Sequence, residues 1–341
     1  MQYFLGIDGG GTKTRAVLVN DTLQVVGTGI SGASNHHAVS ADKAVQHCAE
    51  AAQLAISDAM RIDNSVHKNS IAGWGFGLAG VRRESDAFLM RGRLNSLCGE
   101  TPWILETDAV AAHFGAFNGG TGIVQIAGTG AVSLGVDASQ ERFYTDGWGP
   151  VMGDEGGGYW IGQQALRIAC RSADGRAPRS SLTGAVLGAF GVADCNALVD
   201  FLRKDKASRE TIAGLARLVF DTANGGVHEA ISIREQATDL LAQSITATAK
   251  RILTRHQERS IGDAKPLHLS LCLLGGLLED EYFKAGVAYN IGERFVELKN
   301  NFLPLDSWRI VKPQFDAASG AALLIISRVV KATEKKSEVR S

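Results

Sequence analysis

The residues with the clearest chemical potential form a glycine-rich turn near the N-terminus, Asp8-Gly9-Gly10-Gly11-Thr12-Lys13. Free backbone N–H groups at such a turn can converge on the oxygens of a phosphate, while Thr12 adds a hydroxyl donor and Lys13 adds positive charge. Asp8 stands where a carboxylate can hold Mg²⁺ beside the phosphates. The alternative is an ordinary hairpin turn that uses glycine only for its backbone freedom. The turn joins two runs that are typical of β-strands, residues 3–7 and 14–19.

A second glycine turn, Gly128-Thr129-Gly130, repeats this pattern about 118 residues later. It too lies between two apolar runs, and Thr129 again offers a hydroxyl. We interpret the two turns as a weak internal repeat, in which each of two related domains has a strand, a glycine turn and a strand. Two such turns on opposite sides of a cleft could hold the β- and γ-phosphates of one nucleotide.

Two common phosphate-binding loops do not fit the first turn. A dinucleotide fingerprint requires a third glycine and a following helix, whereas Thr14 occupies that position and a strand pattern follows. A P-loop requires glycine directly before lysine, whereas Thr12 separates Gly11 from Lys13. The spacing therefore excludes both readings.

Strand and helix patterns alternate along the chain, which predicts an α/β fold. Further strands are predicted at 24–27, 71–79, 102–106, 122–127, 131–136, 267–274 and 308–311. Helices are predicted at 41–60, 84–97, 109–117, 160–171, 208–220, 229–256, 282–298 and 316–331. Residues 118–122 have the composition of a linker. We therefore predict one domain over 1–117, a second over 118–332 and a disordered tail over 333–341.

Composition excludes several classes of function. The 341 residues carry a formal net charge of -1, so there is no basic surplus for binding nucleic acid. The apolar runs are too short for a signal peptide or a membrane span, which favours a cytoplasmic protein. The five cysteines are widely spaced, which argues against a disulfide framework or a metal cluster. The pair His36-His37 has no third ligand at metal spacing in the sequence and is typical of a polar loop.

Several segments occur in an order that resembles one known family: 8–14, 33–36, 106–109, 127–130, 147–162, 274–276 and 311–321. They resemble the N-acetylglucosamine and glucosamine kinases of the BadF/BadG-type ATPase family. The most specific segment is 147–162, GWGPVMGDEGGGYWIG. The resemblance implies two ribonuclease-H-like (actin-like ATPase) domains around a central cleft. It also implies transfer of the γ-phosphate of ATP to the 6-hydroxyl of N-acetylglucosamine, with Mg²⁺, and suggests a homodimer by analogy.

The same resemblance assigns roles to individual residues. Asp108 matches the catalytic base, although from spacing alone it could equally be the N-cap of a helix, as Asn35 could be a turn residue. The residues that match sugar-binding positions are Asn35, Asp108, Gly147, Trp148, Gly149 and Asp154. The residues that match nucleotide-binding positions are Gly10, Gly11, Thr12, Lys13, Gly128, Thr129, Gly130, Gly214, Gly275 and Gly276. Asp8 is the expected metal ligand.

The chain departs from the family pattern near the sugar. Ala131-Val132 follow the second turn where the family often has serine, and His37 stands where eukaryotic members have an aromatic residue. Glucosamine and N-acetylmuramate therefore remain open as substrates. Two alternative functions belong to other classes. An ATPase activator of radical dehydratases needs a cysteine pair for an iron–sulfur cluster, and no two cysteines of the sequence have that spacing. A sugar-sensing regulator needs a DNA-binding element, and the sequence shows neither a helix-turn-helix pattern nor a basic surplus.

Overall fold

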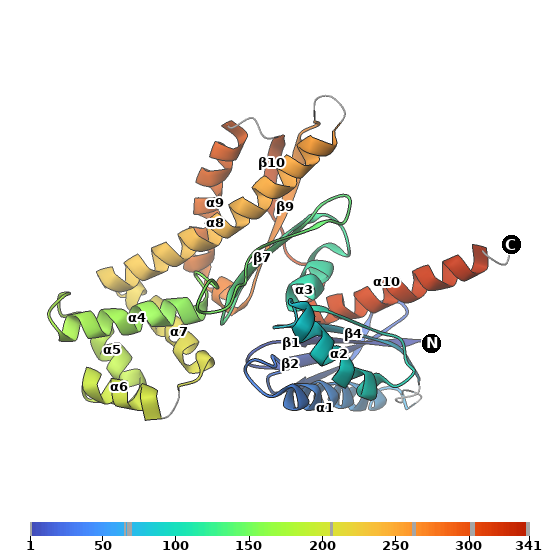
Figure 1. Ribbon diagram of the computed structural model, residues 1–341, viewed down its shortest axis with the longest axis horizontal. Helices are drawn as coiled ribbons and strands as arrows, with labels where there is room; N and C mark the ends of the chain where they lie inside the picture. Colours follow the sequence, from blue (N-terminus) through green and yellow to red (C-terminus); the bar gives the residue numbers. More distant parts are fainter. Residues whose placement is uncertain are drawn as a thin grey trace. The chain divides into compact units, whose positions relative to one another are not determined.

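The computed structural model describes residues 2–64, 66, 70–204, 207–260, 264–300 and 304–338. The chain divides into two compact units. Unit 1 comprises Met1–Gly120 with Lys312–Ser341, and unit 2 comprises Thr121–Val311. Figure 1 shows the elements of both units coloured along the chain.

The C-terminal segment differs from the predicted division. Residues 312–332 were expected in the second domain, but helix α10 (Ala317–Glu338) packs on the sheet of unit 1. The helix also continues to Glu338, so the predicted disordered tail 333–341 is helical in its first part. Residues 339–341 lie outside the described residues.

Each unit contains a five-stranded mixed sheet, and the two sheets have corresponding strand orders, β3-β2-β1-β4-β5 and β10-β9-β6-β7-β8. In both sheets a three-stranded antiparallel meander continues into two parallel strands. This correspondence confirms the predicted repeat. The strands are β1 (Tyr3–Gly9), β2 (Thr14–Asn20), β3 (Val25–Ser31), β4 (Ile71–Leu78), β5 (Trp103–Thr107), β6 (Gly122–Ala127), β7 (Ala131–Val136), β8 (Arg142–Asp146), β9 (Leu267–Leu274) and β10 (Leu305–Ile310).

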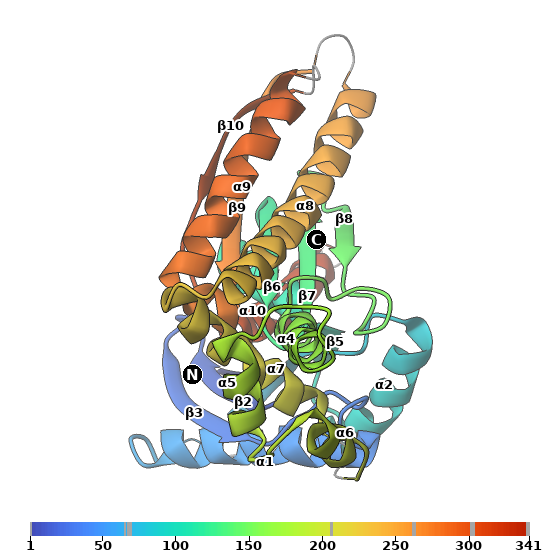
Figure 2. The ribbon, with the colours of Figure 1, turned by 90° about the vertical axis from the view of Figure 1, so that its left-hand side faces the viewer.

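Helices cover both faces of the sheet of unit 1. Alternate residues of β1 point to opposite faces and therefore pack against different helices. Leu5 and Ile7 pack with helices α1 and α2, whereas Phe4 packs with α10. Gly6 lies on the α10 face, where a Cβ atom would come within 2.0 Å of the Ala318 carbonyl oxygen, so only glycine permits this close approach. Figure 2 gives a second view of these layers. The helices of unit 1 are α1 (Ala41–Met60), α2 (Glu84–Cys98), α3 (Asp108–Phe117) and α10.

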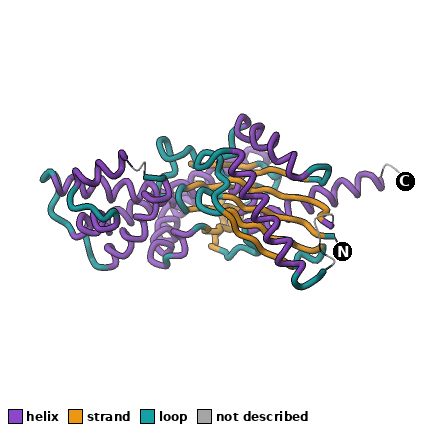
Figure 3. The backbone as a smooth tube through the Cα atoms, turned by 90° about the horizontal axis from the view of Figure 1, so that it is seen from below, coloured by secondary structure: helices purple, strands orange, loops and turns teal. Residues whose placement is uncertain are grey.

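Unit 2 is richer in helix, as Figure 3 shows by colour. Its core joins strands β6 and β9 to the inner faces of the long helix α8 and of α9. Strand β8, helices α5 and α6 and the short 3-10 helix η2 were not predicted. Strand β8 has a single fully buried residue, and α6 also buries only one, Leu198, so their apolar patterns are short. The helices are α4 (Gly158–Ala173), α5 (Ser181–Ala189), α6 (Cys195–Lys204), α7 (Arg209–Asn224), α8 (His228–Arg259), the 3-10 helix η2 (Gly276–Glu279) and α9 (Glu281–Asn300).

Within the part of the chain that is described, none of the helices combines the length and the apolar character that crossing a membrane requires.

Candidate functional site

Three carboxylates gather at the end of β1 in unit 1. Asp8 lies near the end of that strand, Asp108 is the first residue of α3, and Asp316 directly precedes α10. Burial, together with the negative charges of Asp108 and Asp316, raises the pKa of Asp8 to about 7, against the opposing effect of Arg15 and Lys13. The structure therefore brings the predicted base and the predicted metal ligand into one electrostatic cluster.

The N-terminus of α3 is capped by the residue before Asp108 and not by Asp108 itself. The N-cap of α3 is Thr107, whose hydroxyl oxygen accepts a hydrogen bond from the Val110 N–H at 3.2 Å. Asp108 follows it in the first turn, where its carboxylate accepts from the Ala109 N–H. The alternative interpretation of Asp108 as the capping residue is therefore wrong, and its carboxylate stands at the positive end of the helix.

Asp316 is the member of the cluster that the sequence analysis missed. Its Oδ1 accepts a hydrogen bond from the Ser319 N–H at 2.8 Å, which caps α10, and its Oδ2 lies 2.6 Å from Arg15. Helices α3 and α10 cross closely because Gly320 has no side chain: a Cβ there would come within 2.0 Å of the Ala111 carbonyl oxygen. This contact fixes both helix N-termini beside β1. The sequence did contain a signal for this residue: Asp316 is the first residue of the helix predicted over 316–331 and lies in the segment 311–321 that resembles the family.

The carboxylate cluster suits a hard divalent cation. Mg²⁺ prefers oxygen ligands and is commonly held by one or two carboxylates. Burial is the main cause of the raised pKa of Asp8, and the charges of Asp108 and Asp316 add to it, so a nearby cation would favour the ionised carboxyl. The donor type therefore fits the expected ion, with Asp8 as its principal ligand, because Asp316 also binds Arg15 and Ser319 and the three carboxylates do not all lie within 4.8 Å of one another in the described chain.

The first glycine turn is joined to the loop that carries Asn35. The Gly10 carbonyl oxygen accepts hydrogen bonds from the N–H groups of Ser34 and Asn35, both at 3.0 Å. Gly10 also closes the turn through its N–H to the Lys13 carbonyl oxygen, while the side chains of Thr12 and Lys13 remain exposed. The Asn35 carboxamide oxygen accepts a hydrogen bond from the His37 N–H. This is the geometry of a turn residue, the alternative to a sugar-binding role for Asn35 in the sequence analysis. Predicted phosphate and sugar residues are thus neighbours in unit 1.

The second glycine turn in unit 2 is held by a helix N-terminus. The Gly158 N–H donates to the Gly128 carbonyl oxygen at 2.8 Å, and the Tyr159 N–H donates to the Thr129 carbonyl oxygen at 2.9 Å. A Cβ on Gly157 would lie 2.7 Å from the backbone of Gly130. The glycines at the start of α4 therefore allow the helix to approach the turn directly, which explains their place in the segment 147–162.

Asp154 lies beside this turn and is paired with Arg209, a residue that the sequence analysis did not select. The Asp154 carboxylate is buried and accepts from Arg209 Nη2 and, at 3.3 Å, from the Gly149 N–H. Burial raises the pKa of Asp154, whereas the guanidinium of Arg209 lowers it. The backbone of Asp154 has a φ of +58° and donates its N–H to Asp146 Oδ1 at 2.6 Å. An aspartate in this unusual conformation marks a constrained loop.

The remaining predicted residues of unit 2 fall into two groups. Gly147 and Gly149 adopt positive φ angles on either side of Trp148, which is 63% exposed. Gly275 also has a positive φ, and a Cβ there would lie 2.3 Å from the Ala127 carbonyl oxygen, so it packs against the strand that leads into the second turn. Gly214 and Gly276 face open space and show no such close approach.

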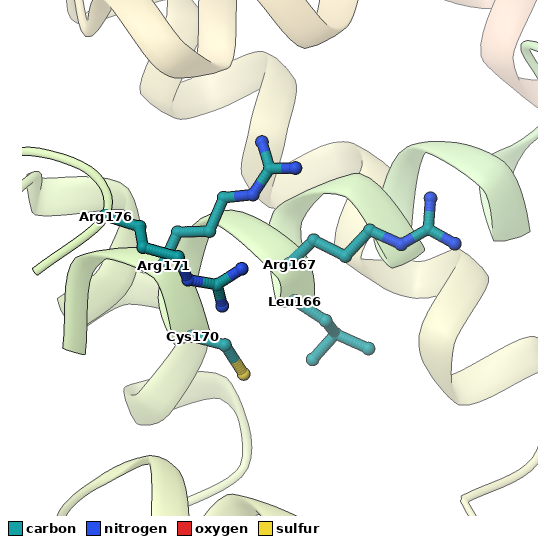
Figure 4. A pocket seen from close by; sticks show the side chains of 5 residues that line it. All are labelled: Leu166, Arg167, Cys170, Arg171 and Arg176. Carbon is teal, nitrogen blue, oxygen red and sulfur yellow. The ribbon is translucent and has the colours of Figure 1, made fainter. Parts of the chain in front are cut away.

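A surface hollow in unit 2 contains none of the predicted residues. Figure 4 shows the arginines that extend around it from the second half of α4 and the turn after it. Its lining consists of Leu166, Arg167, Cys170, Arg171 and Arg176. Although basic, the hollow carries none of the carboxylates or glycine turns described above.

The family model described as the BadF/BadG/BcrA/BcrD ATPase family matches residues 5–325. The chain belongs to this ATPase family.

Relatives of this ATPase family member include kinases of amino sugars. It is 30% identical over 263 residues to the N-acetyl-D-glucosamine kinase of Dictyostelium discoideum, covering 76% of this chain and 82% of the relative. It is 28% identical over 219 residues to the N-acetylmuramic acid/N-acetylglucosamine kinase of Clostridium acetobutylicum, covering 64% of this chain and 70% of the relative. The family expected from the sequence is thereby confirmed.

Solved structures support the same fold for the ATPase family member. A crystal structure from Chromobacterium violaceum, provisionally named an N-acetylglucosamine kinase, aligns with a TM-score of 0.74 and 27% identity over 95% of this chain and 99% of that one. A ROK hexokinase from Thermus thermophilus aligns with a TM-score of 0.55 and 16% identity over 97% of this chain and all of that one. The second likeness concerns the fold alone, and it agrees with two actin-like α/β domains.

Proposed function

We propose that this protein is an ATP-dependent amino-sugar kinase that transfers the γ-phosphoryl group of ATP to the 6-hydroxyl of N-acetylglucosamine. The carboxylate cluster of Asp8, Asp108 and Asp316 at the end of β1, next to a glycine turn, is the observation that carries the proposal. Kinship with a kinase that acts on N-acetylglucosamine supports the choice of substrate.

Asp108 supplies the general base in this proposal. Phosphoryl transfer to a hydroxyl requires a group that accepts the hydroxyl proton as the new P–O bond forms. The Asp108 carboxylate lies in the first turn of α3, where Thr107 already caps the helix, so its position is not explained by helix capping. The leaving group of the same step is ADP.

Asp8 and Asp316 would hold Mg²⁺ with the phosphates. When bound, the ion supplies charge neutralisation at the phosphate oxygens. The first turn contributes its backbone N–H groups, the Thr12 hydroxyl and the Lys13 ammonium to the same phosphates. Gly10 fixes the relation of this turn to Asn35 through the two hydrogen bonds that its carbonyl oxygen accepts.

Unit 2 contributes mainly backbone and one buried carboxylate. We assign nucleotide contacts to the turn Gly128–Gly130 and to Gly214, Gly275 and Gly276. We assign sugar contacts to Asp154 and to the backbone of Gly147 and Gly149 around Trp148. Arg209 orients Asp154 and favours its charged form, because its guanidinium lowers the pKa of a carboxyl that burial raises.

A coupled assay of ADP release over a panel of sugars tests the proposal. The panel contains N-acetylglucosamine, glucosamine, N-acetylmuramate and glucose, each with ATP and Mg²⁺. We expect release to depend on sugar and to be fastest with N-acetylglucosamine. Faster turnover of N-acetylmuramate would move the assignment to the second activity named for the Clostridium relative. ATP hydrolysis that is equal with and without every sugar would contradict the kinase proposal and favour an ATPase activator.

A further inference from the structure

Two adjacent histidines and one aspartate of unit 1 converge on a single point. His36 and His37 lie in the loop that precedes α1, and Asp86 lies in the first turn of α2. The Asp86 Oδ1 atom is 3.1 Å from His36 Nε2 and 3.6 Å from His37 Nε2. Within the described ranges, this is the one group of three histidine, cysteine or acidic residues whose ligand atoms all lie within 4.8 Å of one another.

The donor atoms and their spacing match a transition-metal site. Zn²⁺ binds imidazole nitrogen and carboxylate oxygen at about 2.0–2.2 Å, which places two ligands of a tetrahedral ion about 3.4 Å apart. The observed separations from Asp86 Oδ1 fall on either side of that value. Two imidazoles and a carboxylate are also a common donor set for an ion that keeps one open position.

The surroundings of the cluster orient it. Arg83 holds the other carboxylate oxygen of Asp86, with Nε 3.1 Å from Oδ2, and so leaves Oδ1 directed at the two rings. Partners of this kind fix the orientation of a ligand in metal sites. The His36 side chain is 5% exposed and that of Asp86 is 15% exposed, whereas the His37 side chain is 46% exposed. An ion could therefore enter from the His37 side.

One ring atom of the cluster is left incomplete by the protein. His36 Nδ1 is buried and has no hydrogen-bond partner among the described residues. Buried polar atoms without a partner are uncommon. This nitrogen is not the one that faces Asp86, so the proposed site uses Nε2 of His36 and rests on the spacing of that atom from Asp86. The His268–Asp306 pair in unit 2 offers a contrast, because its side chains are 75% and 51% exposed and it belongs to no such group of three in the described chain.

We propose that His36, His37 and Asp86 form a binding site for a divalent transition-metal ion, with Zn²⁺ as the best match to the donor set. The site adjoins Asn35, because the His37 N–H donates to the Asn35 carboxamide oxygen. A bound ion would fix this loop. That consequence for sugar binding rests on the proposed function of Asn35, whereas metal binding itself does not.

Metal binding by the full-length protein tests the site. After removal of metal with a chelator, Zn²⁺ is titrated by equilibrium dialysis, and Co²⁺ is used as a probe because its visible absorption reports nitrogen and oxygen ligation. With Mg²⁺ in excess to fill the proposed carboxylate site, we expect one Zn²⁺ per chain. His37→Ala and Asp86→Asn should each weaken binding by about 100-fold, while His268→Ala, which alters the other histidine–aspartate pair, should leave it unchanged.

The exposed position of His37 keeps the test decisive even where Asp86→Asn disturbs the loop, since His37→Ala retains the His36–Asp86 pair. Failure to bind one equivalent of Zn²⁺, or equal affinity in wild type and His37→Ala, would overturn the proposal. Zinc retained by both variants would place the ion elsewhere and would overturn it as well. Sugar phosphorylation plays no part in either readout, so the outcome is separate from that of the kinase assay.

Discussion

The two glycine turns occupy equivalent places in the two units but are built from different chemistry. In unit 1 the strand pairing closes at Gly9 opposite Thr14, and Asp8 precedes that pair with two other carboxylates nearby. In unit 2 it closes at Ala127 opposite Ala131, so the apolar Ile126 stands in the place of Asp8. A shared backbone frame thus carries an ionic cluster in one copy and a neutral strand end in the other.

The difference extends to what holds each turn in place. The carbonyl oxygen of the first turn is bound by the Asn35 loop, whereas the carbonyl oxygens of the second are bound by the N-terminus of α4. Buried charge in unit 2 lies to the side, in the Asp154–Arg209 pair. We infer that unit 1 carries the proton and metal chemistry and that unit 2 binds through its backbone. Substitutions in the two turns should therefore fail in different ways.

The largest expected effect is that of Asp108→Asn. If Asp108 is the base, this change should lower kcat for sugar phosphorylation by about 10²–10⁴-fold. Thermal stability should change little because Thr107 caps α3. The assay is ADP release with saturating ATP and sugar. The matched control is Asp194→Asn, which removes an aspartate that does cap a helix, since its Oδ1 accepts from the Ala197 N–H. Equal loss in both variants would reduce Asp108 to a structural residue.

Asp8→Asn should change how the unfolding free energy depends on pH, because the first turn carries a buried carboxyl and the second does not. Because the folded pKa of Asp8 is about 7 against an ordinary 3.8, the folded state binds more protons than the unfolded state between these values. The unfolding free energy of the wild type should therefore fall as pH rises through that window. A difference of about three pKa units corresponds to a loss of up to about 4 kcal/mol.

Denaturant unfolding across pH 4–8 checks this expectation. Asp8→Asn should lack the decline and be more stable than the wild type near pH 8, yet inactive. Addition of Mg²⁺ should flatten the wild-type curve, since a cation favours the ionised carboxyl. Asp21→Asn, at an exposed aspartate in the β2–β3 turn, serves as the control. Parallel curves for wild type and Asp8→Asn would contradict the ionic interpretation of the first turn.

The second turn should respond to shape rather than charge. A Cβ on Gly130 would lie 2.5 Å from Asp154 Oδ2 and 2.7 Å from Arg209 Nη2, whereas a Cβ on Gly128 meets nothing within 4 Å. Gly130→Ala should cost about 1–3 kcal/mol and raise the KM for ATP and sugar. Gly128→Ala should be nearly neutral in unfolding experiments. Equal costs at the two positions would show that the packing around Asp154 does not set the tolerance of this turn.

The smallest expected effect on activity belongs to Arg209→Ala. Because the Asp154 side chain is only 10% exposed, removal of the guanidinium leaves a buried carboxyl unpaired and should cost about 3 kcal/mol of stability. The pKa of Asp154, already raised by burial, should rise further without the guanidinium that lowers it. The acid side of the pH profile of kcat/KM should therefore move to higher pH, and Arg209→Lys should restore part of the shift. An unchanged profile in Arg209→Ala would remove Arg209 from the sugar site.

The sequence predicted the elements that depend on local patterns. The two glycine turns, the strands beside them and the long apolar helices were predicted because each has a strong short-range signal. The repeat was visible for the same reason. Elements with little buried surface, such as β8 and α6, gave no comparable pattern.

The missed residues of the candidate site all depend on distant contacts. Asp316 reaches β1 only because α10 returns to the first sheet after the whole of unit 2. Asp86 meets the His36–His37 pair from a helix about 50 residues away. Arg209 pairs with Asp154 across 55 positions. Periodicity and spacing carry no information about such pairings.

The identity of the phosphorylated product tests the proposed kinase activity most directly. The full-length protein is incubated with ATP, Mg²⁺ and N-acetylglucosamine, and the position of the phosphate is read from carbon–phosphorus coupling in the nuclear magnetic resonance spectrum. We expect a phosphate on carbon 6 of the sugar, formed in equal amount to ADP. Release of inorganic phosphate and ADP, with the sugar recovered unchanged, would contradict the proposed activity.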